Sequence, residues 1–119
     1  MSKLFQPHHL QEYENIFKTD KMLWLWQEFT ADSAEKWKKL PQMNDEQVRL
    51  ALHCWKSSSL IFGMDEFARG CGVLENKLLK HQPAADLAEP LQQLKQCYAA
   101  STTLVAAYFN QYQGKADER

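Results

Sequence analysis

Residues 51–70 read ALHCWKSSSLIFGMDEFARG and place His53 within a helical pattern that ends at Gly63. On a helix that turns about 100° per residue, the inward stripe consists of Val48, Leu52, Trp55, Ser59 and Phe62. A second face, centred about 120° away, consists of Arg49, His53, Lys56, Ser57 and Leu60. We therefore expect His53 to lie on the outward side of an amphipathic helix, where it is available to a partner.

The whole chain has the size and composition of one globular domain. It contains 119 residues, of which 45% are hydrophobic and 24% are charged, so we expect a single domain over residues 1–119. The formal net charge is −1 and the pI is about 6.4. Because this bulk charge attracts neither nucleic acid nor an anionic membrane, we expect neither as a partner.

The cysteines and the N-terminus indicate the compartment. Cys54, Cys71 and Cys97 are odd in number and lack CxxC spacing, which disfavours a disulfide framework or a structural zinc site. We expect each to be a small buried apolar residue in a reducing cytoplasm. The N-terminus is too polar for a secretory signal, and no apolar run approaches the about 18 to 20 residues of a membrane span. We expect a cytoplasmic protein.

Prolines and apolar periodicity divide the chain into helices. The expected segments are a helix over residues 7–17, a helix over about 20–40, the His53 helix from 44 or 45 to about 62, a helix from about 65 to 78, a connection over 83–89 and a last helix from Pro90. Thr19 or Asp20 is the expected N-cap of the second helix, and Asn44 or Asp45 that of the third. Gly63 suits a left-handed helix C-terminus.

These segments predict an all-α fold. No segment alternates with period two for long enough to form a strand. Long helices joined by short loops become antiparallel neighbours, so we expect an up-down-up-down four-helix bundle over residues 20–113. The short helix over 7–17 should cap one end, and residues 114–119 should form a frayed tail.

The neighbours of His53 favour a phosphoryl group over a purely solvated role. Arg49 at i−4 and Lys56 at i+3 bring cations beside the imidazole, and Ser57 at i+4 is small and hydroxylated. Guanidinium, ammonium and hydroxyl groups are the donors that phosphoryl oxygens prefer. Cationic neighbours also favour the neutral imidazole, whose nitrogen lone pair is a nucleophile. A solvated surface histidine is the simpler alternative.

The run HCWKSSSLIFG, residues 53–63, resembles the signature of histidine-phosphotransfer (HPt) domains. In that family a histidine is followed by lysine at the third place, small residues, and glycine at the tenth. The segment FARGCGVLE, residues 67–75, continues the match, and the lysine followed by two serines is similar to small free-standing phosphorelay proteins of quorum-sensing type. Many members have glycine where this chain has Ser57.

The resemblance implies a phosphocarrier rather than an enzyme. His53 would accept the phosphoryl group through Nε2, Lys56 would steady its charge, and Gly63 would shape the turn. The donor and acceptor would be aspartates in the receiver domains of a hybrid sensor histidine kinase and of a downstream response regulator. The receiver would supply the acidic pocket and Mg²⁺, so this chain would need no metal or cofactor, and positioning and electrostatics would dominate the transfer.

The receiver-docking surface remains open between two interpretations. Met22, Leu25 and Phe29 form a second apolar stripe on the second helix, which should pass close to His53 and Leu60. This stripe could dock a receiver together with Leu60, or the N-terminal helix could bury it.

Other functions have weaker support in the sequence. His8 and His9 precede Glu12 without the recurring Glu-x-x-His pairs of a di-iron bundle, so we expect no metal site. The alternative function is a helical adaptor that binds a receiver or kinase domain without being phosphorylated. Nothing requires self-association, and we expect a monomer.

Overall fold

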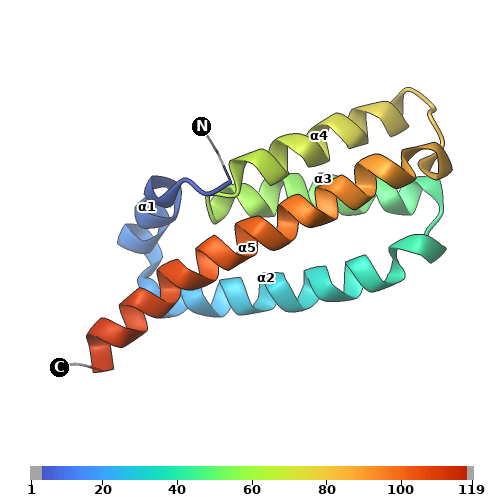
Figure 1. The fold of residues 1–119 in the computed structure, drawn as a ribbon. Helices are drawn as coiled ribbons and strands as arrows, with labels where there is room; N and C mark the ends of the chain where they lie inside the picture. Colours follow the sequence, from blue (N-terminus) through green and yellow to red (C-terminus); the bar gives the residue numbers. More distant parts are fainter. Residues whose placement is uncertain (1–3, 118–119) are drawn as a thin grey trace.

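The structure, a computed structural model, describes residues 4–117 and consists of helices joined by short connections (Figure 1). The elements in chain order are α1 (Pro7–Phe17), α2 (Thr19–Lys39), the 3-10 turn η1 (Leu40–Gln42), α3 (Asp45–Ile61), α4 (Asp65–Leu79), the 3-10 turn η2 (Ala84–Leu87) and α5 (Ala88–Asp117). Residues 4–117 contain no strand, which confirms the predicted all-α class. Within the same residues, no helix is both long and apolar enough to cross a membrane.

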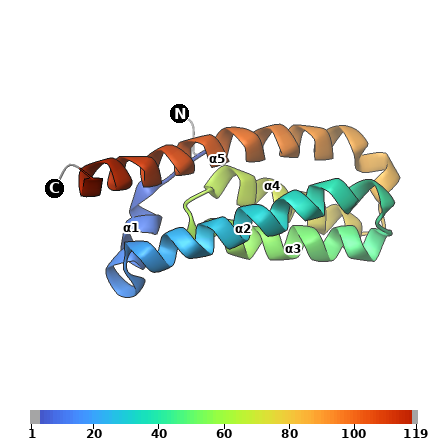
Figure 2. The ribbon, with the colours of Figure 1, turned by 90° about the horizontal axis from the view of Figure 1, so that it is seen from below.

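The four long helices, α2 to α5, lie side by side in both views (Figures 1 and 2). The α2–α3 and α4–α5 connections lie at one end of the molecule, and α1 and the α3–α4 turn lie at the other. The last turns of α5 project beyond the other helices. α5 extends to Asp117, so residues 114–117 of the tail that we expected to fray are helical. Residues 118–119 lie outside the described chain. α5 also begins at Ala88, before Pro90.

The start of α3 follows the predicted capping chemistry. The side-chain oxygen of Asn44 accepts a hydrogen bond from the Gln47 backbone N–H at 2.8 Å, and the Gln47 side chain accepts one from the Asn44 N–H at 2.9 Å. This reciprocal capping box satisfies two backbone donors that the helix itself leaves unpaired. Asn44, rather than Asp45, is therefore the N-cap.

The start of α2 differs from the prediction. Neither Thr19 nor Asp20 caps the helix, because α2 already begins at Thr19 and the preceding residue, Lys18, has a positive φ of 73°. The Lys18 N–H donates to the Glu14 carbonyl at 2.8 Å, which closes the end of α1. One residue thus joins the two helices and leaves no extended position for a side-chain cap.

Gly63 has the left-handed conformation expected of it, with φ of 75°. A Cβ atom at this position would lie 2.3 Å from the carbonyl oxygen of Gln6, and the Gln6 N–H donates to the Gly63 carbonyl at 2.8 Å. A side chain is therefore excluded by both backbone conformation and space. The same contact docks the segment preceding α1 onto the α3–α4 turn, which places α1 at that end of the bundle.

Aromatic side chains fill the core between α2, α3 and α4. Trp55 is 1% exposed, stacks on Trp37 with ring centroids 4.4 Å apart, and meets Phe67 edge to face. Its indole N–H donates to the buried hydroxyl of Ser33 at 2.9 Å. Burial of a large ring with its polar atom satisfied anchors the inward side of α3 and turns the opposite side outward.

The stripe of Met22, Leu25 and Phe29 is mostly core. Met22 is fully buried and belongs to the same apolar cluster as Leu10 of α1, so its prediction as a docking residue is wrong. The reason is that α1 packs against the first turns of α2. Leu25 and Phe29 are half-buried against the core, and the Phe29 ring lies 5.3 Å from that of Phe62.

Candidate functional site

His53 lies near the middle of α3 with 54% of its side chain exposed, as the helical pattern predicted. The other residues predicted around it share its side of the helix. Leu60 is 46% exposed, Ser57 is exposed, and the side chains of Lys56 and Arg49 are 42% and 21% exposed. The imidazole can therefore be reached from solvent, with hydroxyl, ammonium and apolar groups on the same helix face.

A carboxylate that the sequence analysis did not assign to the site lies at its base. Glu75 of α4 has a side chain only 7% exposed, and its Oε2 atom lies 2.9 Å from Nδ1 of His53. The same oxygen accepts a hydrogen bond from Arg49 at 3.2 Å, and Oε1 accepts one from the Lys56 ammonium at 3.3 Å. One buried acidic group thus joins all three basic residues of the α3 face.

One signal in the sequence could have identified Glu75. On α4, the buried residues Phe67, Cys71, Leu74 and Leu78 form an apolar stripe, and Glu75 follows Cys71 by four residues on that side. A carboxylate on an inward face is rarely left without basic partners. The pattern therefore indicates a buried ion pair, although the sequence alone does not give its partners.

Glu75 is ionised at neutral pH. Burial raises the pKa of its carboxyl group, but hydrogen bonds from Lys56 and His53 and the positive charge of Lys56 outweigh this effect and leave the pKa below the ordinary value of 4.5. An ionised carboxylate only accepts hydrogen bonds. We therefore assign the shared proton to Nδ1 of His53, which leaves the lone pair on Nε2 at the exposed side of the ring.

Arg49 is held more firmly than Lys56. Two of its nitrogens donate to Glu46 on the same helix, at 2.9 and 2.6 Å, while a third donates to Glu75. The hydrogen bond with Glu46 is the main reason that the pKa of Arg49 is raised. Lys56 makes one longer contact and has twice the exposed fraction, so its ammonium is freer to turn toward a group attached to His53.

The family model named Hpt domain matches residues 25–103, which is more than half of the chain and includes both His53 and Glu75. The chain belongs to the Hpt domain family. Comparisons with curated proteins and with solved structures gave no match. Hpt domains are phosphocarrier modules rather than enzymes of the ordinary kind: they act in histidine phosphotransfer within phosphorelays and interact with receiver domains.

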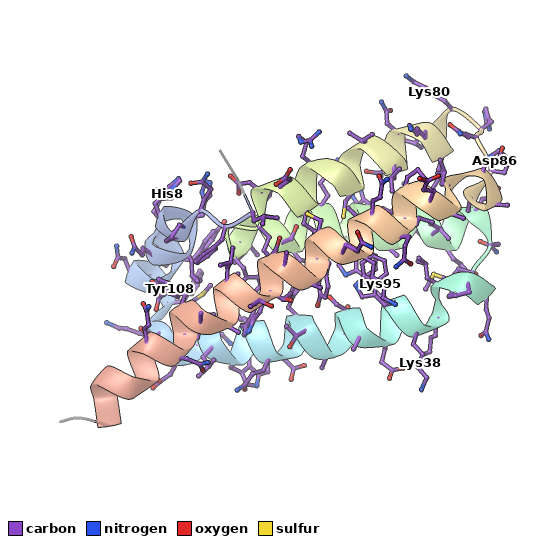
Figure 3. All side chains as sticks on the ribbon, viewed as in Figure 1. His8, Lys38, Lys80, Asp86, Lys95 and Tyr108 are labelled. Carbon is purple, nitrogen blue, oxygen red and sulfur yellow. The ribbon has the colours of Figure 1, made fainter. Side chains whose placement is uncertain are left out.

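Other side chains considered from the sequence lie away from this Hpt site or differ from expectation. His8 projects from α1 at the capped end (Figure 3), and His9 lies 3.4 Å from Asp65. Within residues 4–111, whose side chains the structure describes, no group of three or more His, Cys, Asp and Glu side chains is arranged to hold a metal ion.

The cysteines do not share one environment. Cys71 is buried and Cys97 is half-buried, and burial raises the pKa of both thiols. Cys54 is exposed, so the expectation that all three are buried is wrong for this residue. It follows His53 directly, beyond the edge of the apolar stripe that faces the core.

Proposed function

We propose that Nε2 of His53 carries a phosphoryl group between aspartates of two receiver domains. The observation that carries the proposal is the 2.9 Å contact between Nδ1 and the buried Glu75 carboxylate beneath an exposed imidazole, in a chain of the Hpt family. The contact supports one tautomer and one ring orientation, which is the positioning that phosphoryl transfer requires.

The transfer step needs no further reactant. The Nε2 lone pair attacks phosphorus, the bond from phosphorus to the aspartyl oxygen breaks, and that oxygen leaves as a carboxylate. The imidazole keeps its Nδ1 proton and becomes positively charged while phosphorylated. Glu75 faces this proton and would stabilise the charge. Attack by an aspartate of the second receiver reverses the same step.

Lys56 and Ser57 would stabilise the transferred group. A phosphoryl group on Nε2 brings negative charge to the exposed side of the ring, and the Lys56 ammonium lies on that helix face, where its hydrogen bond to Glu75 is long, at 3.3 Å. The hydroxyl of Ser57, one turn after His53, can donate to a phosphoryl oxygen. Arg49 would act mainly by holding Glu75 in place, because its donors are already shared between two carboxylates.

The partner would complete the site. The receiver domain would supply its acidic pocket and Mg²⁺, so this chain would act without a metal or cofactor of its own.

We propose that the donor belongs to a hybrid sensor histidine kinase and the acceptor to a downstream response regulator, in the cytoplasm. The chain would act as a monomeric up-down-up-down four-helix bundle. The exposed Leu60 would form the docking surface, together with the half-buried Leu25 and Phe29.

The test is transfer of labelled phosphate from a panel of phosphorylated receiver domains to the purified protein. The expected product is an acid-labile, alkali-stable label that is absent from His53→Gln and retained by His81→Gln, whose exposed histidine lies beyond α4. Failure of every competent donor to label the wild type would contradict the proposal. If receiver domains bind both the wild type and His53→Gln but never label the wild type, the chain is the helical adaptor instead.

A further inference from the structure

Gly72 lies in the middle of α4, where glycine is unfavourable for helix stability. A Cβ atom built at this position would lie 3.1 Å from Cδ of Lys56 on the neighbouring helix α3. This distance is shorter than ordinary contacts between methyl and methylene groups, which are about 3.5 to 4.0 Å. The Lys56 stem therefore occupies space that a side chain at position 72 would need.

The course of the Lys56 side chain connects this space with the proposed phosphoryl site. Its stem passes Gly72, and its ammonium reaches Oε1 of Glu75, three residues further along α4, at 3.3 Å. Because residues three apart share a helix face, Gly72 and Glu75 lie on the same side of α4. Gly72 faces the methylenes of Lys56, and Glu75 contacts its ammonium. With 42% of its side chain exposed, Lys56 keeps its ammonium partly in water while its methylenes rest on the helix.

The nearby glycine of the same helix has a different environment. A Cβ atom at Gly70 would lie 2.7 Å from Cδ1 of Leu94, in the contact between α4 and α5. Gly70 therefore allows two helices to pack closely. Gly72 instead faces the Lys56 stem, which leads to the site on α3.

We propose that Gly72 is a positioning residue: its missing side chain leaves room for the Lys56 stem against α4 and so directs the Lys56 ammonium to Glu75 beside His53. The inference that this placement serves phosphotransfer rests on the proposed function. A side chain at position 72 would push the Lys56 stem outward and lengthen its contact with Glu75. The ammonium would then no longer be held at the base of the imidazole.

The first measurement is independent of phosphate. Hydrogen bonds from Lys56 and His53 lower the pKa of Glu75 against the opposing effect of burial, and Arg49 also contacts this carboxylate. In Gly72→Ala, the titration of Glu75, followed by carbon NMR of its carboxyl group, should shift to higher pH. Asn76→Ala is the matched control, because Asn76 is an exposed residue of the same helix and the substitution also favours helix without meeting Lys56.

The second measurement is phosphotransfer combined with stability. Gly72→Ala should slow transfer from a receiver by about two- to tenfold, the lower part of the range for residues in contact, while its urea midpoint should stay equal or rise. In a Lys56→Ala background, Gly72→Ala should have no further effect on transfer. If Gly72 served helix packing alone, Gly72→Ala would leave both the Glu75 titration and the transfer rate unchanged, whatever its effect on the midpoint.

The outcomes separate this inference from the proposed function. An unchanged Glu75 titration in Gly72→Ala refutes the positioning role of Gly72, whatever the transfer rate. If the Glu75 titration shifts in Gly72→Ala but no receiver can label the wild type, the result supports the positioning role of Gly72 and refutes the phosphocarrier function. If Gly72→Ala fails to fold, the Gly72→Ala/Lys56→Ala double variant should recover the fold when the clash with the Lys56 stem is the cause, and failure to recover it overturns the inference.

Discussion

Replacing Glu75 with glutamine tests the centre of the site most directly. The substitution preserves the size of the side chain and removes its negative charge, which the basic groups of His53, Lys56 and Arg49 share in the wild type. We expect a less stable protein at neutral pH and slower phosphotransfer, because the imidazole loses the partner that orients it and stabilises its charged, phosphorylated form.

The contacts give the expected magnitude. A buried hydrogen bond to a charged group contributes about 1.5 to 3 kcal/mol, but a partly exposed ion pair contributes about 1 kcal/mol or less. The side chains of His53 and Lys56 are 54% and 42% exposed, so both can regain water when the charge is removed. We expect Glu75→Gln to lower the free energy of unfolding by about 1 to 2 kcal/mol at pH 7, which would lower the urea midpoint by about 0.5 to 1 M.

The pH dependence has a defined sign. The pKa of Glu75 in the folded protein lies below its ordinary value of 4.5, so its stabilising effect is complete above about pH 4.5 and is lost as the pH falls through the folded value. The difference in stability between wild type and Glu75→Gln should therefore close in acid, as the pH falls through the folded pKa of Glu75. Other acidic groups titrate in both proteins and cancel from the difference.

The assay is urea unfolding followed by tryptophan fluorescence at a series of pH values. Glu46→Gln is the control, because it removes another partner of Arg49 at the surface and leaves Glu75 in place. Equal midpoints for wild type and Glu75→Gln at pH 7, or a difference that persists unchanged in acid, would refute the assignment of Glu75 as the ionised base of the site.

Three further substitutions test the fold and the site. Lys56→Ala should leave helicity intact, because the side chain is 42% exposed, and should slow transfer or shorten the phosphohistidine lifetime by about tenfold; lost circular dichroism would contradict its surface placement. Trp55→Ala should lower the free energy of unfolding by about 3 to 5 kcal/mol, measured by urea denaturation, and the half-exposed Trp24→Ala should cost far less. Gly63→Ala, with φ of 75° and its Cβ 2.3 Å from a backbone oxygen, should cost about 1 to 3 kcal/mol or more, and a thermal midpoint equal to wild type would count against the described turn.

The helices could be predicted because their signals are local. The capping pair of Asn44 and Gln47 and the left-handed Gly63 bracket α3, and each depends only on residues a few positions apart. The same local logic was wrong at the start of α2, where Thr19 follows directly from α1 without a cap. There the chain path between two packed helices, rather than the preference of the residue, decides the boundary.

The surface of α2 could not be predicted for a related reason. Met22, Leu25 and Phe29 are apolar and evenly spaced, which is equally compatible with a docking surface and with core. The packing of α1 against the first turns of α2 buries Met22 completely and leaves Leu25 and Phe29 half-buried. An amphipathic pattern reports that a face needs a partner, but it does not report which partner covers it.

The sequence alone determined that His53 and Lys56 lie on the outward side of a helix, because the helical repeat relates residues of one helix to each other. Only the tertiary structure decided that Glu75, 22 residues after His53, lies beneath the imidazole and that Gly72 makes room for Lys56. These contacts depend on the register of α4 against α3. That register is set by how the side chains of two helices interdigitate, which no periodicity within one helix contains.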